Sequence, residues 1–242
     1  MINQKCPLVL RDLYSYDVVS AFPSIMQMQD YDFGDVDLSN KEERNRFIGK
    51  QQIGNKNLSD FLNDSVRDLT DFYLQYNEIE DDDVVFRQKD GFILRKMLAK
   101  NDTYMEMKLR SIIDLLIIDP TRQKLLYFDQ SGGCYVKGVR YNYDALNTVY
   151  RRFYDLDFYN KKTLCLQLES IKQDVVHNPD KLFYGINGDD GQYIFMLKNG
   201  KTIRTRDPDF VDNNLIDTRR YFTVYFKPFV DSVFVEEFYG SK

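Results

Sequence analysis

The segment Tyr16-Asp17-Val18-Val19-Ser20-Ala21-Phe22-Pro23-Ser24-Ile25 joins a predicted strand to a predicted helix. Residues 8–19 are rich in β-forming residues and carry an acidic residue, Asp17, close to their end. Pro23 suits the first turn of a helix, which we expect to run to about Met28. The sequence therefore predicts a carboxylate at a strand end, beside a strand-to-helix turn, where a metal ligand can be placed.

The composition is that of a globular protein. The chain has 242 residues, of which 43% are apolar and 15% aromatic, enough for a core in one large domain or two small ones. No apolar run approaches the ~20 residues of a membrane helix, and residues 1–11 lack the pattern of a signal peptide. We therefore expect a cytoplasmic protein without a membrane partner.

Few residues of the chain are natural ligands of soft metals. The three cysteines are scattered and show no metal-type spacing, which indicates a reducing compartment. The lone His177 excludes a site built from several histidines. Any metal site is therefore expected to consist of carboxylates.

The charge of the chain is unevenly distributed. The net charge of -5 argues against a protein that is basic all over and binds nucleic acid with its whole surface. Residues 122–162, however, contain eight Lys or Arg residues and four Asp residues, a local excess of positive charge. Such a strip could follow a phosphate backbone, or it could be an ordinary solvated face.

The remaining pattern predicts alternating groups of helices and strands. The sequence from Ser39 to Glu42 reads as a capping box, so a helix should begin there and end near residue 54, and a second helix should cover residues 58–76. Strands are expected at 84–87, 92–94, 105–110, 112–118, 124–128 and 135–139. Helices are expected at 143–154 and 162–176, followed by a hairpin around residues 187–191.

A second carboxylate that could join Asp17 is Asp90, in the predicted tight turn between residues 84–87 and 92–94. Two-metal phosphoryl transfer needs carboxylates that hold two divalent ions about 4 Å apart. A hairpin tip can lie beside a neighbouring strand end, although Asp-Gly is also a common turn in its own right. A rival carboxylate lies in the Gly188-Asp189-Asp190 turn, which is similar to a turn of RNA-dependent polymerases.

These two segments resemble motifs of the family B (α-like) DNA polymerases. The segment at Asp17 resembles the first motif, D-x-x-S-L-Y-P-S-I, and the segment at Asp90 resembles the third, Y-G-D-T-D-S. The resemblance implies that Asp17 and Asp90 are the two principal metal ligands, for Mg²⁺ or Mn²⁺. Gln88 replaces the first aspartate of the third motif.

The resemblance extends to residues that would bind the nucleotide. In the family, a helix with a triphosphate-binding lysine ends in N-S-x-Y-G, and here the run Arg46 to Gly54 takes its place. Arg46 and Lys50, four residues apart, would share one helix face and bind the triphosphate. Phe22 takes the position of the tyrosine that discriminates between sugars. Alternatively, residues 46–54 could be an ordinary surface helix that carries two cations and binds no nucleotide.

A fourth match follows in the same order. Lys124 to Tyr127, and then Lys137 to Arg140, resemble the K-K-x-Y…K-G segment that contacts the primer-template near the active site. The resemblance implies that Lys124, Tyr127, Lys137 and Arg140 bind nucleic acid. Cations on the exposed face of a plain β-hairpin would give the same pattern.

Together the matches imply an α+β fold in which an antiparallel-sheet palm with packed helices precedes a smaller, mainly helical or mixed, thumb-like region. The palm would cover residues 1–140, with vestigial fingers at about 25–77, and the thumb-like region residues 141–242. The interval between Ser24 and Lys41 is short and acidic where the family has a long fingers helix. No exonuclease domain is expected before Asp17.

The leading hypothesis is a minimal family B-like DNA polymerase or nucleotidyltransferase that uses two-metal-ion catalysis. Its partners would be dNTP, primer-template DNA or another nucleic acid, and a protein subunit that supplies the missing fingers. A virus would be a natural source of so reduced an enzyme. The alternatives are a catalytically inactive, polymerase-derived module for nucleic-acid binding or assembly, and an unrelated α+β protein.

Overall fold

The computed structural model describes residues 2–4, 6–100, 105–138, 144–177, 186–187, 192–196, 202–205 and 217–235. Their contacts group the chain into two compact units. Unit 1 comprises Met1–Cys6 and Leu13–Ile112, and unit 2 comprises Pro7–Asp12 and Ile113–Lys242. The boundary that we expect near residue 140 falls in a segment outside the described residues, and the assignment of palm and thumb stays a prediction.

The main sheet confirms the expected α+β class. Its six strands lie in the order β2-β3-β1-β4-β5-β6. They are β1 (Val9–Val18), β2 (Val84–Arg87), β3 (Gly91–Leu94), β4 (Met107–Ile118), β5 (Leu125–Asp129) and β6 (Cys134–Lys137). The pairs β1–β3, β2–β3, β4–β5 and β5–β6 are antiparallel. The two strands expected at 105–110 and 112–118 are one strand, β4, because no glycine or proline interrupts this run.

Three helices of unit 1 follow the predicted pattern: α1 (Ala21–Met28), α2 (Lys41–Gly54) and α3 (Lys56–Tyr76). The cap of α2 is Asn40, one residue beyond the expected Ser39. The Asn40 side chain accepts hydrogen bonds from the backbone N–H groups of Glu42 and Glu43, which would otherwise lack partners. Ser39 instead donates its hydroxyl proton to Asp37.

The core of unit 1 lies between α3 and the sheet. Leu62, Val66 and Tyr73 recur at helical spacing on α3 and are fully buried. They belong to one apolar cluster with Tyr16 of β1 and Phe92 of β3. Asp81–Asp83 form a short 3-10 helix before β2. This packing fixes the ends of β1 and β3, on which the two candidate carboxylates depend.

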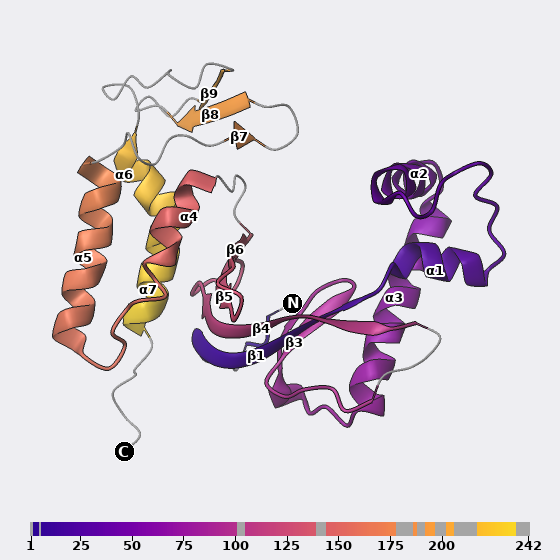
Figure 1. The fold of residues 1–242 in the computed structure, drawn as a ribbon, viewed down its shortest axis with the longest axis horizontal. Helices are drawn as coiled ribbons and strands as arrows, with labels where there is room; N and C mark the ends of the chain where they lie inside the picture. The colour runs from indigo at the N-terminus through magenta and orange to yellow at the C-terminus, as the bar shows by residue number, and fades with distance from the viewer. Residues whose placement is uncertain are drawn as a thin grey trace. The chain divides into compact units, whose positions relative to one another are not determined.

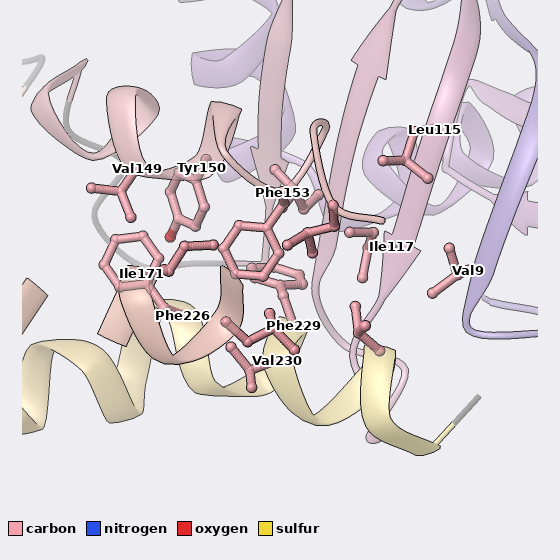
Figure 2. Packing of buried hydrophobic residues seen from close by; sticks show 14 of the residues in the cluster. Val9, Leu115, Ile117, Val149, Tyr150, Phe153, Ile171, Phe226, Phe229 and Val230 are labelled. Atoms are coloured by element: carbon pink, nitrogen blue, oxygen red, sulfur yellow. The ribbon is translucent and has the colours of Figure 1, made fainter. Parts of the chain in front are cut away.

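Unit 2 contains α4 (Asp144–Arg151), α5 (Lys161–His177), α6 (Thr218–Tyr221), a π-helical turn (Phe222–Phe226) and α7 (Lys227–Val235) (Figure 1). Aromatic side chains fill its core, where Tyr150 and Phe153 contact Phe229 and Phe226 contacts Tyr150 (Figure 2). Ile117 of β4 lies in the same cluster. The two ends of β4 thus belong to separate cores.

A small second sheet also belongs to the residues of unit 2. Its strands are β7 (Ile186–Asn187), β8 (Gln192–Met196) and β9 (Thr202–Thr205), in sequence order. The pairing of Ile186 with Tyr193 agrees with the hairpin predicted around residues 187–191. The Gly188-Asp189-Asp190 turn lies outside the described residues. Within the part of the chain that the structure describes, no helix has the length and apolarity to cross a membrane.

Candidate active site

Strand pairing brings Asp17 close to the turn that contains Asp90. In the antiparallel pair β1–β3, Tyr16 is opposite Phe92 and Asp17 is opposite Gly91. The pairing continues one step further, because the Val18 N–H donates a hydrogen bond to the Asp90 carbonyl oxygen at 2.7 Å. Two residues that are 73 positions apart in the sequence, Asp17 and Asp90, therefore lie on adjacent backbone segments at one end of the sheet.

Both carboxylates border one cavity of about 520 Å³ in unit 1. The cavity walls come from the end of β1, the first turn of α1, one face of α2, the β2–β3 turn and β4. The charged residues among them are Asp17, Asp90, Lys41, Arg44, Lys89 and Arg110. Four cations thus face two carboxylates, and the cavity suits a ligand with negative charge or a metal-bound anion.

Gly91 permits the close approach of the two strands at this point. A Cβ atom at position 91 would lie 2.0 Å from the Tyr16 carbonyl oxygen and 2.6 Å from Oδ1 of Asp17. No side chain fits there without moving the backbone. The glycine of the Asp90-Gly91 pair therefore serves the packing against Asp17 as well as the turn.

Asp17 is held from the other side by Arg110 of β4. The Arg110 Nε lies 3.2 Å from Oδ2 of Asp17, and the side chains are 46% and 31% exposed respectively. β1 lies between β3 and β4 in the sheet, so the Asp17 carboxylate has Gly91 beside Oδ1 and Arg110 beside Oδ2. Sequence reasoning missed Arg110, because only the position of β4 next to β1 brings it to the site.

The face of α2 that borders the cavity differs from the one inferred from the sequence. Lys41 and Arg44 line the cavity, as their three-residue spacing allows. Arg46 is not among the lining residues, and its guanidinium pairs with Glu42 at 3.0 Å. Lys50 is likewise absent from the lining. The predicted triphosphate contacts of Arg46 and Lys50 stay untested, and the structure offers Lys41 and Arg44 as cations at the cavity itself.

Arg44 is anchored at the cavity wall. One terminal nitrogen donates a hydrogen bond to the Leu38 carbonyl oxygen at 3.0 Å. Its Nε atom is buried and has no hydrogen-bond partner among the described residues. A buried donor without an acceptor is costly.

Phe22 also lines the cavity, in the first turn of α1. Lys89 from the β2–β3 turn lies over its ring, with Nζ 4.6 Å from the ring centroid. This cation–π contact ties the turn that carries Asp90 to the helix that follows Asp17. Phe22 thus lines the cavity, and its role at a sugar stays a prediction.

Of the residues predicted to contact nucleic acid, Tyr127 lies on β5, Lys137 on β6 and Lys124 just before β5, all in unit 2. Tyr127 stacks on Tyr135 with ring centroids 4.9 Å apart, and Nζ of Lys137 lies 5.9 Å from the Tyr127 ring centroid. Nζ of Lys124 donates to the Val224 carbonyl oxygen at 3.5 Å. Arg140 lies outside the described residues. The structure thus groups Tyr127 and Lys137 on one hairpin face, and their role in binding nucleic acid stays a prediction.

The donor set at the cavity is compatible with one kind of metal. Among the described residues no group of three or more His, Cys, Asp or Glu side chains is placed to hold a metal ion. Two carboxylates remain, and Mg²⁺ is commonly held by one or two carboxylates together with waters and substrate phosphates. Two such carboxylates would suit Mg²⁺ or Mn²⁺ that also binds a polyphosphate rather than a cage made only of protein ligands, and the metal at Asp17 and Asp90 stays a prediction.

Comparison with solved structures gives a distant structural likeness. No protein-family profile and no curated protein sequence matches the chain. The chain is similar to a solved family B DNA polymerase. That enzyme comes from the hyperthermophilic archaeon Pyrobaculum calidifontis, with a TM-score of 0.46 and 12% sequence identity. The match covers 100% of this chain and 47% of that chain, so this chain spans about half the length of the polymerase.

Proposed function

We propose that the chain is a minimal nucleotidyltransferase of the DNA polymerase type, in which Asp17 and Asp90 bind divalent metal for phosphoryl transfer. The observation that carries the proposal is the convergence of both carboxylates, from strands paired in register, on one cavity with a surplus of cations. The order of the sequence motifs supports the same reading. A distant structural likeness of this size adds nothing to it.

The residues around the cavity suggest how the chemistry would be divided. A bound Mg²⁺ ion would lower the pKa of an attacking hydroxyl and neutralise charge on the leaving phosphate. Asp17 and Asp90 would hold the metal, and Lys41, Arg44 and Lys89 would bind phosphate oxygens of a nucleoside triphosphate. Phe22, half-buried at the start of α1, would contact the sugar.

Unit 2 would contribute the residues that bind the nucleic acid. Lys124, Tyr127, Lys137 and Arg140 would contact the primer-template, by charge and by stacking. A further protein subunit would supply the nucleotide contacts that the short segment between α1 and α2 does not provide. A virus-encoded enzyme that works in the cytoplasm would match this reduced design.

Primer extension on a labelled primer-template, with Mg²⁺ or Mn²⁺ and dNTPs, tests the proposal. We expect Asp17→Ala and Asp90→Ala each to lower extension by at least about 100-fold, because each removes a metal ligand. Asp60→Ala, on the exposed side of α3, is the matched control and should keep full activity. Undiminished primer extension by both Asp17→Ala and Asp90→Ala would contradict the assignment of these residues as metal ligands.

A second candidate is a module that binds nucleic acid without catalysis. Two observations favour it: Asp17 already pairs with Arg110, and Gln88 stands where the polymerase motif has its first aspartate. Binding of the primer-template in a fluorescence-anisotropy assay, without any extension in Mg²⁺ or Mn²⁺, would select this candidate. Equal binding by Asp17→Ala would further show that the carboxylate has no part in it.

A further inference from the structure

We infer that the cavity in unit 1 binds the adjacent phosphate groups of a polyphosphate anion without the help of a divalent ion. The inference deepens the proposed function and rests on it only for the phosphate character of the ligand. It changes the proposed chemistry in one respect: the cations of the chain, and not a metal ion, hold the polyphosphate in the cavity.

The charge at the cavity favours an anion. Four cations line the cavity against two carboxylates. One of these carboxylates, Asp17, is already paired with Arg110 at 3.2 Å, so this pair contributes little net charge. The charged groups that remain are Lys41, Arg44 and Lys89 against Asp90. The cavity therefore attracts a multiply charged anion before any metal ion has bound.

The three remaining cations are not neutralised by other carboxylates. Within the part of the chain that the structure describes, Lys41, Arg44 and Lys89 form no ion pair. Arg44 donates a hydrogen bond to the Leu38 carbonyl oxygen, and Lys89 lies over the Phe22 ring. Both contacts hold a cation at the cavity wall without cancelling its charge. The charges reach the cavity from two elements, α2 and the β2–β3 turn, so a bound anion can contact more than one of them.

The start of helix α1 adds to the positive character of the same cavity. Ser20, the cap residue of α1, makes no capping hydrogen bond with its side chain, and Ser20, Ala21 and Phe22 all line the cavity. The first N–H groups of a helix have no partner within the helix and carry partial positive charge. The cavity volume of about 520 Å³ lies within the range of roughly 300–1,000 Å³ that is typical of small-molecule sites.

Isothermal titration calorimetry of the full chain with pyrophosphate in excess EDTA measures binding without metal and without any catalytic assay. We expect saturable binding in EDTA. Lys41→Gln and Lys89→Gln should each weaken it at least about fivefold, because each removes a charged donor from the cavity. Lys50→Gln is the matched control, since Lys50 lies on the same helix as Lys41 but does not line the cavity, and it should change the affinity less than about twofold.

Asp90→Asn distinguishes a site made of cations from a site that depends on metal. In EDTA this change should strengthen pyrophosphate binding about two- to fivefold, because it removes a negative charge that lines the cavity with the anion. Weaker binding by Asp90→Asn would overturn the inference. Melting temperatures of all four variants should be measured as well, to show that a change in affinity is not caused by unfolding.

Competition in EDTA distinguishes two sources of phosphate, a nucleoside triphosphate and a nucleic-acid backbone. dATP should displace pyrophosphate at least about tenfold better than a short single-stranded oligonucleotide does, because the phosphates of an oligonucleotide are separate and carry one charge each. Better displacement by the oligonucleotide would overturn the assignment of a polyphosphate ligand.

The outcomes separate this inference from the proposed function. Pyrophosphate that binds only after Mg²⁺ is added, or that binds the cavity variants as tightly as the wild type, would overturn the inference and leave the proposed metal centre standing. Pyrophosphate binding in EDTA with the expected losses in Lys41→Gln and Lys89→Gln, but without any primer extension in Mg²⁺ or Mn²⁺, would support the inference and overturn the proposed function.

Discussion

At the scale of single residues, Gly91 is the position where a substitution should do most harm to the site. We predict that Gly91→Ala lowers the free energy of unfolding by about 1–3 kcal/mol, because its Cβ would meet the Tyr16 carbonyl oxygen and force the two strands apart. Gly49→Ala is the matched control. Gly49 lies inside α2 with open space around it, so alanine there should stabilise by about 0.5–1 kcal/mol.

Urea denaturation of the three proteins measures both changes. Equal effects of the two substitutions would show that β1 and β3 do not approach each other at Gly91 as described. A Gly91→Ala protein of wild-type stability with normal strand pairing would lead to the same conclusion about β1 and β3.

Asp129 in unit 2 gives a prediction about pH. Burial is the largest single influence on the pKa of Asp129, and it raises that pKa. Hydrogen bonds from the Ser131 hydroxyl and from the Gly133 and Ser131 N–H groups together outweigh burial. The pKa of Asp129 is therefore lowered overall. A depressed carboxyl pKa contributes stability that is present above the unfolded pKa of about 3.9 and is lost as the pH falls through the folded value.

We therefore expect Asp129→Asn to lower the melting temperature at pH 7 and to flatten its decline between about pH 4 and pH 2. Thermal melts across this range are the measurement. An unchanged pH profile in the variant would show that the Asp129 carboxylate does not form these bonds as an anion.

The residues of the site differ in how far the sequence could predict them. The positions of Asp17 and Asp90 were predictable, since a carboxylate at a strand end and an Asp-Gly turn are local patterns. Arg110 was not, because its importance depends on which strand lies next to β1. No local pattern contains that information.

At the scale of elements, helix α2 decides which cations reach the cavity. We predict that Arg44→Gln weakens binding of dATP in the presence of Mg²⁺ about five- to tenfold, because it removes a charged donor from the cavity wall. Arg46→Gln is the matched control and should change the affinity less than about twofold, since Arg46 pairs with Glu42 at an exposed position.

Isothermal titration calorimetry of both variants gives the two affinities directly. The opposite order, with Arg46→Gln the weaker binder, would support the face of α2 inferred from the sequence motif. The melting temperatures of both variants should be measured as well, to show that any loss of binding is not caused by unfolding.

The existence of α2 was predictable from the capping sequence before it and the glycine at its end, but its rotation about its own axis was not. The helix has few apolar residues, and only Ile48 is buried, so the sequence shows no clear stripe that orients it. Ile48 itself lines the cavity together with Lys41 and Arg44. By contrast, the apolar stripe of α3 predicted its buried face, since Leu62, Val66 and Tyr73 are all in the core.

At the scale of the whole molecule, two separate apolar clusters stabilise the two units. We predict that Phe229→Ala lowers the stability of unit 2 by about 3–5 kcal/mol, because the ring is fully buried against Tyr150 and Phe153. Hydrogen exchange should then accelerate in α5 and α7 more than in α3, whose core contains none of these residues. Equal acceleration in all three helices would show that the units unfold as one.

The fold class was predictable from the sequence because strand, turn and helix patterns alternate clearly through residues 8–138. The division of the chain into two contact units was not predictable from the sequence. β1 and β4 each run through both units, so the grouping changes within strands and leaves no linker, glycine cluster or change of composition to mark it.

A crystal structure of the chain soaked in Mn²⁺, with anomalous scattering recorded for the metal, tests the central claim most directly. We predict an anomalous peak at bonding distance, about 2.1–2.2 Å, from carboxylate oxygens of both Asp17 and Asp90. A cavity without a peak, or carboxylates more than about 8 Å apart and hence too distant to share an ion, would contradict the claim that these two residues form a metal centre.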